Sequence, residues 1–203
     1  MRLARLPSLI LASASPRRQE LLARLGIPFS VRPSEIPEPQ PPGPPADAVM
    51  ELARAKARAV ARLVTAEAAG ERGGRTVVLG ADTEVFLDGR ALGKPADAAD
   101  AGRMLRALRG RIHEVITGLA LVEVGGGWEE TASVTTRVRM ADYSEAALEA
   151  YVATGEPFDK AGGYAVQGEG GRLVAEVDGC FTNVVGLPVE TTRRLLAAWG
   201  LSG

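Results

Sequence analysis

Two adjacent arginines, Arg17 and Arg18, stand where a helix is expected to begin, a placement that is unfavourable unless an anion binds there. Ser15 is expected to cap this helix and Pro16 to be its first residue. A cation in the first turn costs about 0.3–1 kcal/mol, because it faces the positive end of the helix dipole. A phosphate would reverse that cost by binding the guanidinium groups, the free amides and the hydroxyls of Ser13 and Ser15. The alternative is a pair of solvated arginines on a surface helix.

A lysine interrupts the apolar face of a long helix that we expect from Asp47 to about Ala69. At about 100° per residue, the apolar side chains form one stripe. Its members are Val49, Leu52, Ala53, Val60, Leu63 and Val64. Lys56 falls in the middle of this stripe, where an ammonium is rare unless it is paired. It therefore meets either a buried carboxylate or a bound anion, and the alternative is that it extends along the helix to solvent.

Asp82 and Glu35 are the carboxylates best placed for chemistry, with Glu38 and Glu84 as weaker candidates. Asp82 follows an apolar strand expected over residues 76–79, and we expect residues 80–83 to form a turn at its carboxyl end. A carboxylate there can hold Mg²⁺ or take a proton from water. The alternative is a helix cap or a hairpin contact.

Another cation, Lys94, follows a hairpin turn expected at Asp88 and Gly89. It lies in a Gly-Lys-Pro sequence that is, taken alone, an ordinary turn.

Composition excludes several classes of protein. The 203 residues carry a net charge of −1, so no global basic field draws the chain to nucleic acid or to a membrane surface. A single cysteine excludes a disulfide framework, and no apolar run approaches a membrane span or a signal peptide, so we expect a soluble cytoplasmic protein. The one histidine, His113, lies in an expected strand and is interpreted as structural. Any metal must then be a hard cation such as Mg²⁺ or Mn²⁺, held by carboxylates and phosphate oxygens.

Strands and helices alternate along the chain, which predicts an α/β fold with a mixed sheet covered by helices, in a single domain over residues 1–203. A proline-rich loop follows the second strand, and a glycine-rich region spans residues 162–171. The expected strands are 9–12, 29–32, 76–79, 112–124, 128–140 and 172–177, and the expected helices are 16–25, 47–69, 97–108, 144–153 and 188–199. In such sheets, ligands gather at the carboxyl ends of strands.

Five short motifs follow one another along the chain: the segments 13–18 (SASPRR), 80–83 (GADT), 93–95 (GKP), 159–162 (DKAG) and 182–188 (TNVVGLP). Their order and spacing resemble the Maf family of nucleoside triphosphate pyrophosphatases, from Leu9 to Trp199. The resemblance implies a long twisted mixed sheet flanked by helices, with two lobes around a central cleft, similar to inosine triphosphate pyrophosphatases. It also implies hydrolysis of a nucleoside triphosphate to the monophosphate and pyrophosphate with a divalent cation, Mg²⁺ or Mn²⁺. The family includes house-cleaning enzymes and has a link to septum formation.

Three positions resemble the pyrimidine-type Maf enzymes, which act on dTTP and UTP: Arg17, Thr83 and Gln167. The 7-methyl-GTP type usually has Trp, Gln and Glu there. A glutamine amide offers both a donor and an acceptor, as a uracil or thymine edge requires. The resemblance implies that Asp82 is the catalytic base and that Asp82 with Glu35 holds the metal. The residues that it implies for substrate binding are Ser13, Ser15, Arg17, Arg18, Lys56, Thr83, Lys94 and Gln167.

Two other functions stay open at this point. One is a nucleotide-binding regulator of cell division with little catalysis, against which the full set of cations and Asp82 argue. The other is a pyrophosphatase for inosine triphosphate or other modified nucleotides. The predicted partner is the nucleoside triphosphate, with no nucleic acid and no membrane; the oligomeric state, a homodimer included, is left open.

Overall fold

A computed structural model describes residues 8–38, 43–67 and 75–202 of the chain. The end of the long helix at Ala69, the glycine-containing break after it and part of the proline-rich loop lie outside these residues. No helix in the described ranges is both long enough and apolar enough to cross a membrane.

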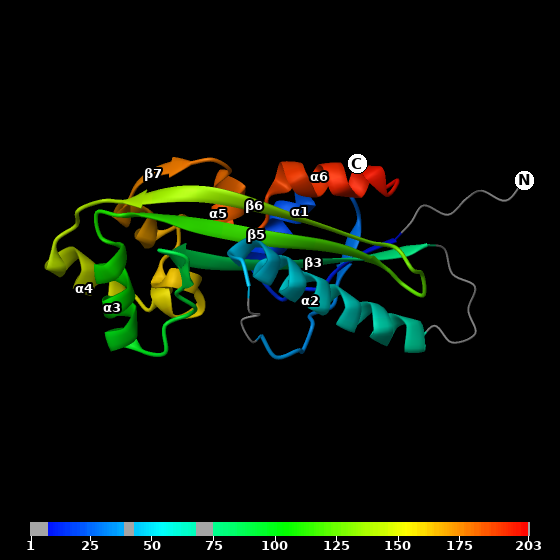
Figure 1. The fold of residues 1–203 in the computed structure, drawn as a ribbon, viewed down its shortest axis with the longest axis horizontal. Coiled ribbons are helices and arrows are strands. Elements are labelled where there is room, and N and C mark those ends of the chain that lie inside the picture. The colour runs from blue at the N-terminus through cyan, green and yellow to red at the C-terminus, as the bar shows by residue number, and fades with distance from the viewer. Residues whose placement is uncertain (1–7, 39–42, 68–74, 203) are drawn as a thin grey trace, which may run out of the picture. The chain divides into compact units, whose positions relative to one another are not determined.

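Within these ranges, seven strands form one mixed sheet that helices flank, which confirms the α/β prediction (Figure 1). The strands are β1 (Ser8–Leu11), β2 (Phe29–Val31), β3 (Thr76–Leu87), β4 (Arg90–Ala91), β5 (Ile112–Glu123), β6 (Glu129–Met140) and β7 (Val174–Asp178). Their order is β2-β1-β3-β5-β6-β7, with β4 paired to β3. β1 runs parallel to β2 and β3, whereas β3 with β4 and β6 with β7 are antiparallel.

The predicted helices begin close to the expected residues, and capping side chains fix the first turn of three of them. The helices of the structure are α1 (Pro16–Ala23), α2 (Pro45–Glu67), α3 (Ala98–Leu108), α4 (Glu145–Ala153), α5 (Phe181–Val185) and α6 (Val189–Ala198). The Oγ of Ser15 accepts the N–H of Arg18 at 3.4 Å, and the carboxylate of Asp97 accepts the N–H of Asp100 at 2.8 Å. The short helix α5 was not predicted, since five residues carry too little periodicity to reveal it.

The hairpin between β3 and β4 confirms the turn predicted at Asp88 and Gly89. Both residues have positive φ, 52° and 74°, and Leu87 pairs with Arg90 across the turn. Two consecutive left-handed residues match the twist of the flanking strands, which is why aspartate followed by glycine marks such turns.

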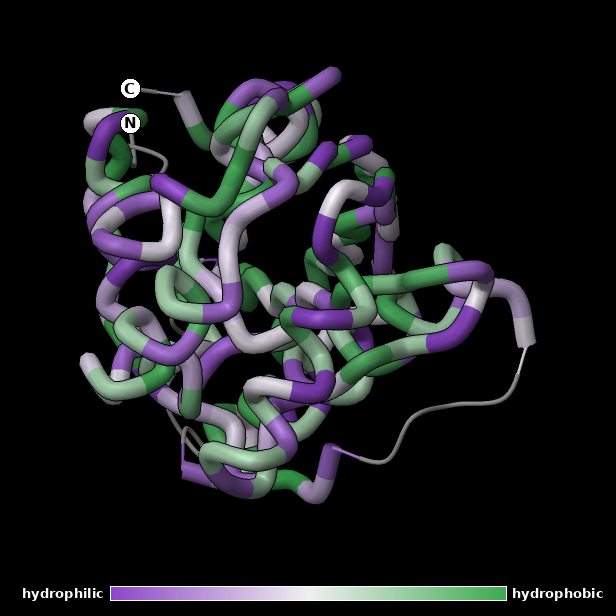
Figure 2. The backbone as a smooth tube through the Cα atoms, turned by 90° about the vertical axis from the view of Figure 1, so that its left-hand side faces the viewer, coloured by the Kyte–Doolittle hydropathy of each residue, from purple (hydrophilic) through white to green (hydrophobic). Residues whose placement is uncertain are grey.

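By its internal contacts, the chain divides into two compact units. Unit 1 comprises Met1–Asp82, Thr117–Val134 and Gly186–Gly203, and unit 2 comprises Thr83–Ile116 and Thr135–Val185. Hydrophobic and hydrophilic stretches alternate along the backbone, as Figure 2 shows, and each unit has a buried apolar cluster of its own.

In unit 1, α2 lies along the sheet beside β3 (Figure 1). Its small residues Ala53, Ala57 and Val60 are fully buried against β1, β3 and β5. Two glycines in the strands make this close approach possible. A Cβ at Gly80 would lie 2.1 Å from the carbonyl oxygen of Ala53, and a Cβ at Gly118 would lie 2.4 Å from the backbone of Val49.

In unit 2, α3 and α4 pack against each other and against the strands. Leu105 and Leu108 of α3 are fully buried, and Tyr143 donates its hydroxyl proton to the carbonyl of Leu105 at 2.6 Å. The glycine-rich region forms short 3-10 turns instead of regular structure, among them η2 (Ala161–Gly163) and η3 (Glu169–Leu173).

Two local predictions are wrong. Residues 80–83 form no turn, because β3 continues through them to Leu87. Gly80 follows an apolar run and so suggests a turn, but its missing side chain serves the close approach of α2 instead. Leu63, which the helical stripe places on the buried face, is 49% exposed, whereas Val64, the next residue of α2, packs against the unit 1 cluster.

Candidate functional site

Lys56 is the most deeply buried charged side chain of α2, at 5% exposure, and it contacts two carboxylates. Its Nζ lies 2.8 Å from Oδ1 of Asp82, which is 8% exposed, and 2.6 Å from Oε1 of Glu38. Of the alternatives that the sequence left open for Lys56, the structure has the buried carboxylate. All three residues belong to unit 1.

The backbone explains why Lys56 and Asp82 meet. Side chains alternate along a strand, so Gly80 and Asp82 project from the same face of β3. Gly80 lies against Ala53, and Lys56 follows Ala53 by nearly one helical turn, on the same side of α2. The close packing of Ala53 on Gly80 therefore places the ammonium of Lys56 beside the carboxylate of Asp82, two residues further along β3.

Glu38, ranked below Glu35 by the sequence, is the glutamate that reaches this cluster. It lies on the loop after β2, and its side chain is 49% exposed. Glu35 lies on the same loop and is exposed, and no ion pair of Glu35 is found among the described residues. Its place in a metal site stays a prediction. The loop has no periodicity, so the sequence offered no signal for choosing between the two.

Contacts within unit 1 fix Arg18 at the start of α1. Its Nε donates to the carbonyl of Gly186 at 2.9 Å, and its Nη1 donates to Oγ of Ser13 at 3.3 Å. Burial lowers the pKa of Arg18 below its ordinary value of 12.5, while the charges of Asp82 and Glu38 oppose that shift. The guanidinium of Arg18 thus stays charged beside the cluster formed by Lys56, Asp82 and Glu38.

The two serines support the same turn. Oγ of Ser13, itself buried, accepts the N–H of Ser15 at 3.3 Å, and Ser15 caps α1. Arg17 is partly buried in the first turn of that helix. Residues 13–18 therefore form a turn with fixed internal hydrogen bonds just after β1, where the sequence predicted it. This turn is the candidate site for an anion. The carbonyl of Gly186 was missed as a partner, although its motif was noted.

The remaining predicted residues lie in unit 2 and are more exposed. Thr83 is partly buried in β3, directly after Asp82, while Lys94 and Gln167 are exposed. Glu84, a weaker carboxylate candidate, accepts the N–H groups of Val85 and Gly93 at 3.0 and 3.1 Å. It thereby fixes the segment that precedes Lys94.

His113 has the properties of a structural residue, as the sequence suggested. It is 2% exposed in β5, and its Nε2 lies 2.7 Å from the hydroxyl of Tyr164. Burial lowers the pKa of His113 from 6.5 to about 4. The ring is therefore neutral near pH 7 and belongs to the unit 2 core.

Comparison with known proteins places the chain in a family. The profile of the Maf-like protein family matches residues 8–199. The chain belongs to the Maf family. A protein of Moorella thermoacetica named dTTP/UTP pyrophosphatase is 50% identical over 194 residues, covering 95% of each chain. A protein of Anaeromyxobacter dehalogenans with the same name is 51% identical over 197 residues, covering 96% of this chain and 95% of the other. The Staphylococcus aureus Ham1 protein aligns with a TM-score of 0.42 at 14% identity, over 68% of this chain and 75% of that one.

In this Maf protein, Asp82 and Glu38 are the carboxylates that could hold a divalent cation. Both offer the hard oxygen ligands that Mg²⁺ prefers, and Mg²⁺ in nucleotide enzymes commonly takes one or two carboxylates together with substrate phosphates. Among the residues that the structure describes, no group of three or more His, Cys, Asp or Glu side chains could hold a metal. A cation held by these two carboxylates would need further oxygen ligands.

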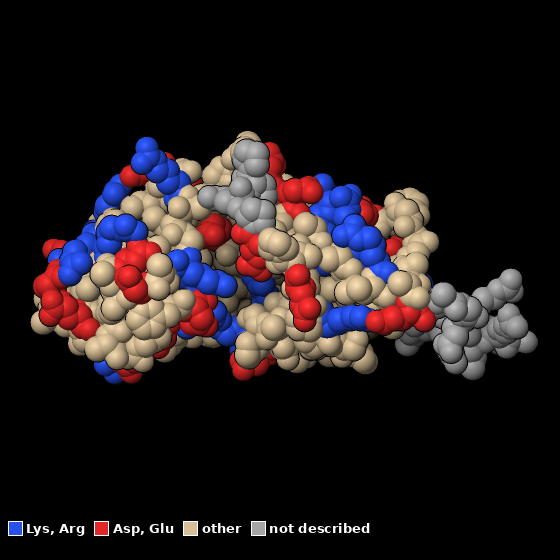
Figure 3. Space-filling view, turned by 90° about the horizontal axis from the view of Figure 1, so that it is seen from below, with Lys and Arg blue, Asp and Glu red and all other residues tan. Residues whose placement is uncertain are grey.

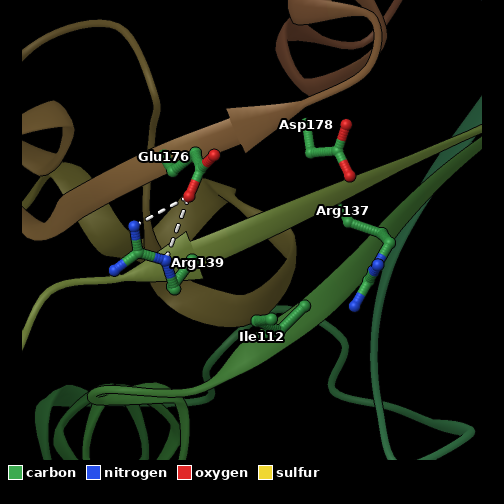
Figure 4. A pocket seen from close by; sticks show the side chains of 5 residues that line it. All are labelled: Ile112, Arg137, Arg139, Glu176 and Asp178. Atoms are coloured by element: carbon green, nitrogen blue, oxygen red, sulfur yellow. Dashed lines mark hydrogen bonds and ion pairs between the residues drawn. The ribbon is translucent and has the colours of Figure 1, made fainter.

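On the face in Figure 3, basic and acidic atoms lie interleaved. A hollow in unit 2 is lined by Ile112, Arg137, Arg139, Glu176 and Asp178 (Figure 4). There Arg139 is already paired with Glu176 at 2.7 Å, and none of the predicted site residues lines the hollow.

Proposed function

We propose that this Maf protein hydrolyses dTTP and UTP to the nucleoside monophosphate and pyrophosphate. The observation that carries the proposal is the buried contact of Lys56 with Asp82, beside the charged Arg18. A carboxylate held in place by one cation, with a second cation close by, suits attack by water on a phosphorus atom. The names of relatives about half identical over nearly the whole chain support the choice of substrates.

Asp82 is the proposed base. Its carboxylate would orient the attacking water and take its proton, and the water oxygen would form a bond to the α-phosphorus as the bond to the pyrophosphate oxygen breaks. Lys56 fixes the position of that carboxylate through its 2.8 Å contact. Arg17 and Arg18, with the hydroxyls and amides of the Ser13–Ser15 turn, would bind the phosphates and oppose their charge.

A divalent cation, Mg²⁺ or Mn²⁺, is part of this proposal. Bound there, it would polarise phosphate oxygens and neutralise developing charge. Asp82 and Glu38 would hold it, since both carboxylates already converge on one cationic group, the ammonium of Lys56. Glu35, which the family resemblance suggested as the second ligand, is the competing candidate.

Recognition of the substrate's nucleobase is assigned to unit 2. Gln167, with Thr83, would select uracil or thymine, and Lys94 would bind phosphate. These roles rest on the resemblance to pyrimidine-type Maf enzymes and on the donor and acceptor of the glutamine amide.

The test is a substrate panel with the purified protein and Mg²⁺ or Mn²⁺, in which dTTP, UTP, 7-methyl-GTP, dATP and ITP are compared. We expect dTTP and UTP to be cleaved fastest, with equal amounts of monophosphate and pyrophosphate, and EDTA to stop the reaction. Orthophosphate as the first product, or a preference for 7-methyl-GTP, would refute the proposal. Tight dTTP binding without turnover would indicate a nucleotide-binding regulator of cell division, the function that would also account for a septum link.

A further inference from the structure

Glu156, which follows α4 at the start of the turn η1 (Glu156–Asp159), accepts three hydrogen bonds within unit 2. Tyr151 of α4 donates its hydroxyl proton to Oε1 at 3.2 Å. The backbone N–H of Glu169 donates to Oε2, and that of Gly170 to Oε1, each at 3.1 Å. Bonds to a charged acceptor are about twice as strong as neutral ones. Both amides belong to the glycine-rich segment that carries Gln167, so the carboxylate anchors that segment.

The same tyrosine also ties the segment on the other side of Gln167. The N–H of Ala165 donates to the hydroxyl oxygen of Tyr151 at 3.2 Å. Residues 165–170 thus form an arc whose two ends are fixed to one pair of side chains, Tyr151 and Glu156. Gln167 lies between these ends and is exposed.

Glycines allow the arc to follow the anchor closely. Gly168 has φ +96°, and a Cβ there would lie 2.8 Å from Oε2 of Glu156. A Cβ at Gly170 would lie 2.6 Å from the hydroxyl of Tyr151. Without side chains at these two positions, the backbone can lie directly against the side chains of Glu156 and Tyr151. Gly168 also has a positive φ, which other residues rarely adopt.

The anchor is itself held in place. The N–H of Glu156 donates to Oγ1 of Thr154 at 3.1 Å, and its carbonyl accepts from Nζ of Lys160 at 2.8 Å. Burial, with the nearby charge of Glu156, raises the pKa of Tyr151 above its ordinary value of 10. The hydroxyl therefore keeps the proton that it donates throughout the neutral range.

We propose that Glu156 is a positioning residue that fixes the loop carrying Gln167 and thereby sets which base the enzyme accepts. The inference rests on the proposed function, in which Gln167 contacts the pyrimidine. An amide can discriminate between bases only when its donor and acceptor are held within a fraction of an ångström of their partners. Glu156 supplies that constraint through backbone amides and needs no contact with the substrate.

A double-mutant cycle between Glu156 and Gln167 tests this role. The preference for dTTP over dCTP, as a ratio of kcat/KM, is measured for wild type, Glu156→Gln, Gln167→Ala and the double variant. We expect each single variant to lose about tenfold in preference, mainly through KM for dTTP, and the double variant to lose no more than Gln167→Ala alone. Additive losses, or a loss in kcat with the preference unchanged, would overturn the proposal.

Two variants keep the test interpretable. Glu169→Gln removes a carboxylate from the same segment, but that side chain pairs with Arg172 at 3.0 Å, so the preference should be unchanged. Tyr151→Phe removes one donor and keeps the ring, and it replaces Glu156→Gln if that variant fails to fold. We expect it to lower the preference in the same direction, and an unchanged preference in Tyr151→Phe would contradict the role of the anchor.

Hydrogen exchange at the amides of Glu169 and Gly170 tests the anchor without substrate. We expect slow exchange in wild type and exchange about tenfold faster in Glu156→Gln, with the amides of α3 unaffected. Equal exchange in the two proteins would overturn the inference whatever the wild type hydrolyses. A wild type that cleaves no pyrimidine triphosphate would instead refute the proposed function, so the two failures are distinguishable.

Discussion

The two units hold their candidate residues in different ways. In unit 1, the charged side chains of Lys56, Asp82 and Glu38 contact one another, and burial fixes the first two. In unit 2, Lys94 and Gln167 are exposed, and neighbouring backbone contacts with Glu84 and Glu156 fix the segments that carry them. The difference indicates that unit 1 positions charged side chains through packing, whereas unit 2 positions exposed side chains through its backbone. Substitutions in unit 1 should therefore change kcat, and those in unit 2 should change KM and selectivity.

The largest effect is expected for Asp82→Asn. Asparagine has nearly the same size but cannot take a proton, so turnover should fall by about 10²–10⁴ while dTTP still binds. Single-turnover rate and dTTP affinity are measured on the same variant. Asp88→Asn, on the exposed hairpin where Asp88 pairs with Arg111, serves as the control and should behave as wild type. Lost binding with an intact chemical rate would remove Asp82 from the catalytic step.

Lys56→Met should lower turnover by about 10²–10³, the scale of losing one preorganised charge contact. It should also destabilise the fold by about 3–5 kcal/mol, because the buried carboxylate of Asp82 loses its partner. Urea unfolding measures the stability, and the double variant with Asp82→Asn should recover part of it. Arg62→Met, on the exposed face of α2, is the control. Wild-type turnover in a folded Lys56→Met protein would show that Lys56 only completes the packing.

A comparison of Glu38→Gln with Glu35→Gln separates the two glutamates of one loop. Because Glu38 contacts Lys56 at 2.6 Å, Glu38→Gln should lower turnover by about tenfold to a hundredfold and raise the Mg²⁺ concentration needed for half activity. Glu35→Gln should have less than a threefold effect. The activity of both variants is measured as a function of Mg²⁺ concentration. A larger effect of Glu35→Gln than of Glu38→Gln would instead identify Glu35 as the metal ligand.

The smallest effect on activity is expected at His113, where stability should respond instead. Its folded pKa of about 4 lies below the ordinary 6.5, so between these values the unfolded chain binds a proton that the folded chain does not. Stability should be unaffected by this group above pH 6.5 and should fall by up to about 3 kcal/mol as the pH falls to 4. Urea unfolding of wild type and His113→Gln across this range measures the difference. Parallel pH dependences in the two proteins would contradict this assignment.

Local rules allowed much of the fold to be predicted. Ser15 and Asp97 mark helix starts because their oxygens accept the first free amides. Asp88 with Gly89 marks a hairpin turn because both residues tolerate the positive φ that such a turn requires. Lys56 stood out because an ammonium on an apolar stripe is rare unless it is paired, but the sequence left a carboxylate, an anion and solvent open as its partner.

Other features depend on tertiary contacts that no local pattern records. Gly80 looked like a turn residue because Ala53, the residue of α2 against which it packs, lies 27 residues earlier in the chain. Glu38 could not be preferred to Glu35, since an irregular loop sets no spacing between its side chains. Glu156 carried no signal, because two of its three partners are backbone amides, which are not specific to a residue type.

Gly80 and Gly118 have a consequence for how natural variation in this chain should be interpreted. Neither carries a reactive group, yet any larger residue would lift α2 from the sheet and with it the lysine that meets Asp82. A single added methyl group could therefore abolish turnover without touching a catalytic atom. In a survey of variants, such changes would be grouped with folding defects, although their first effect would be a misplaced charge.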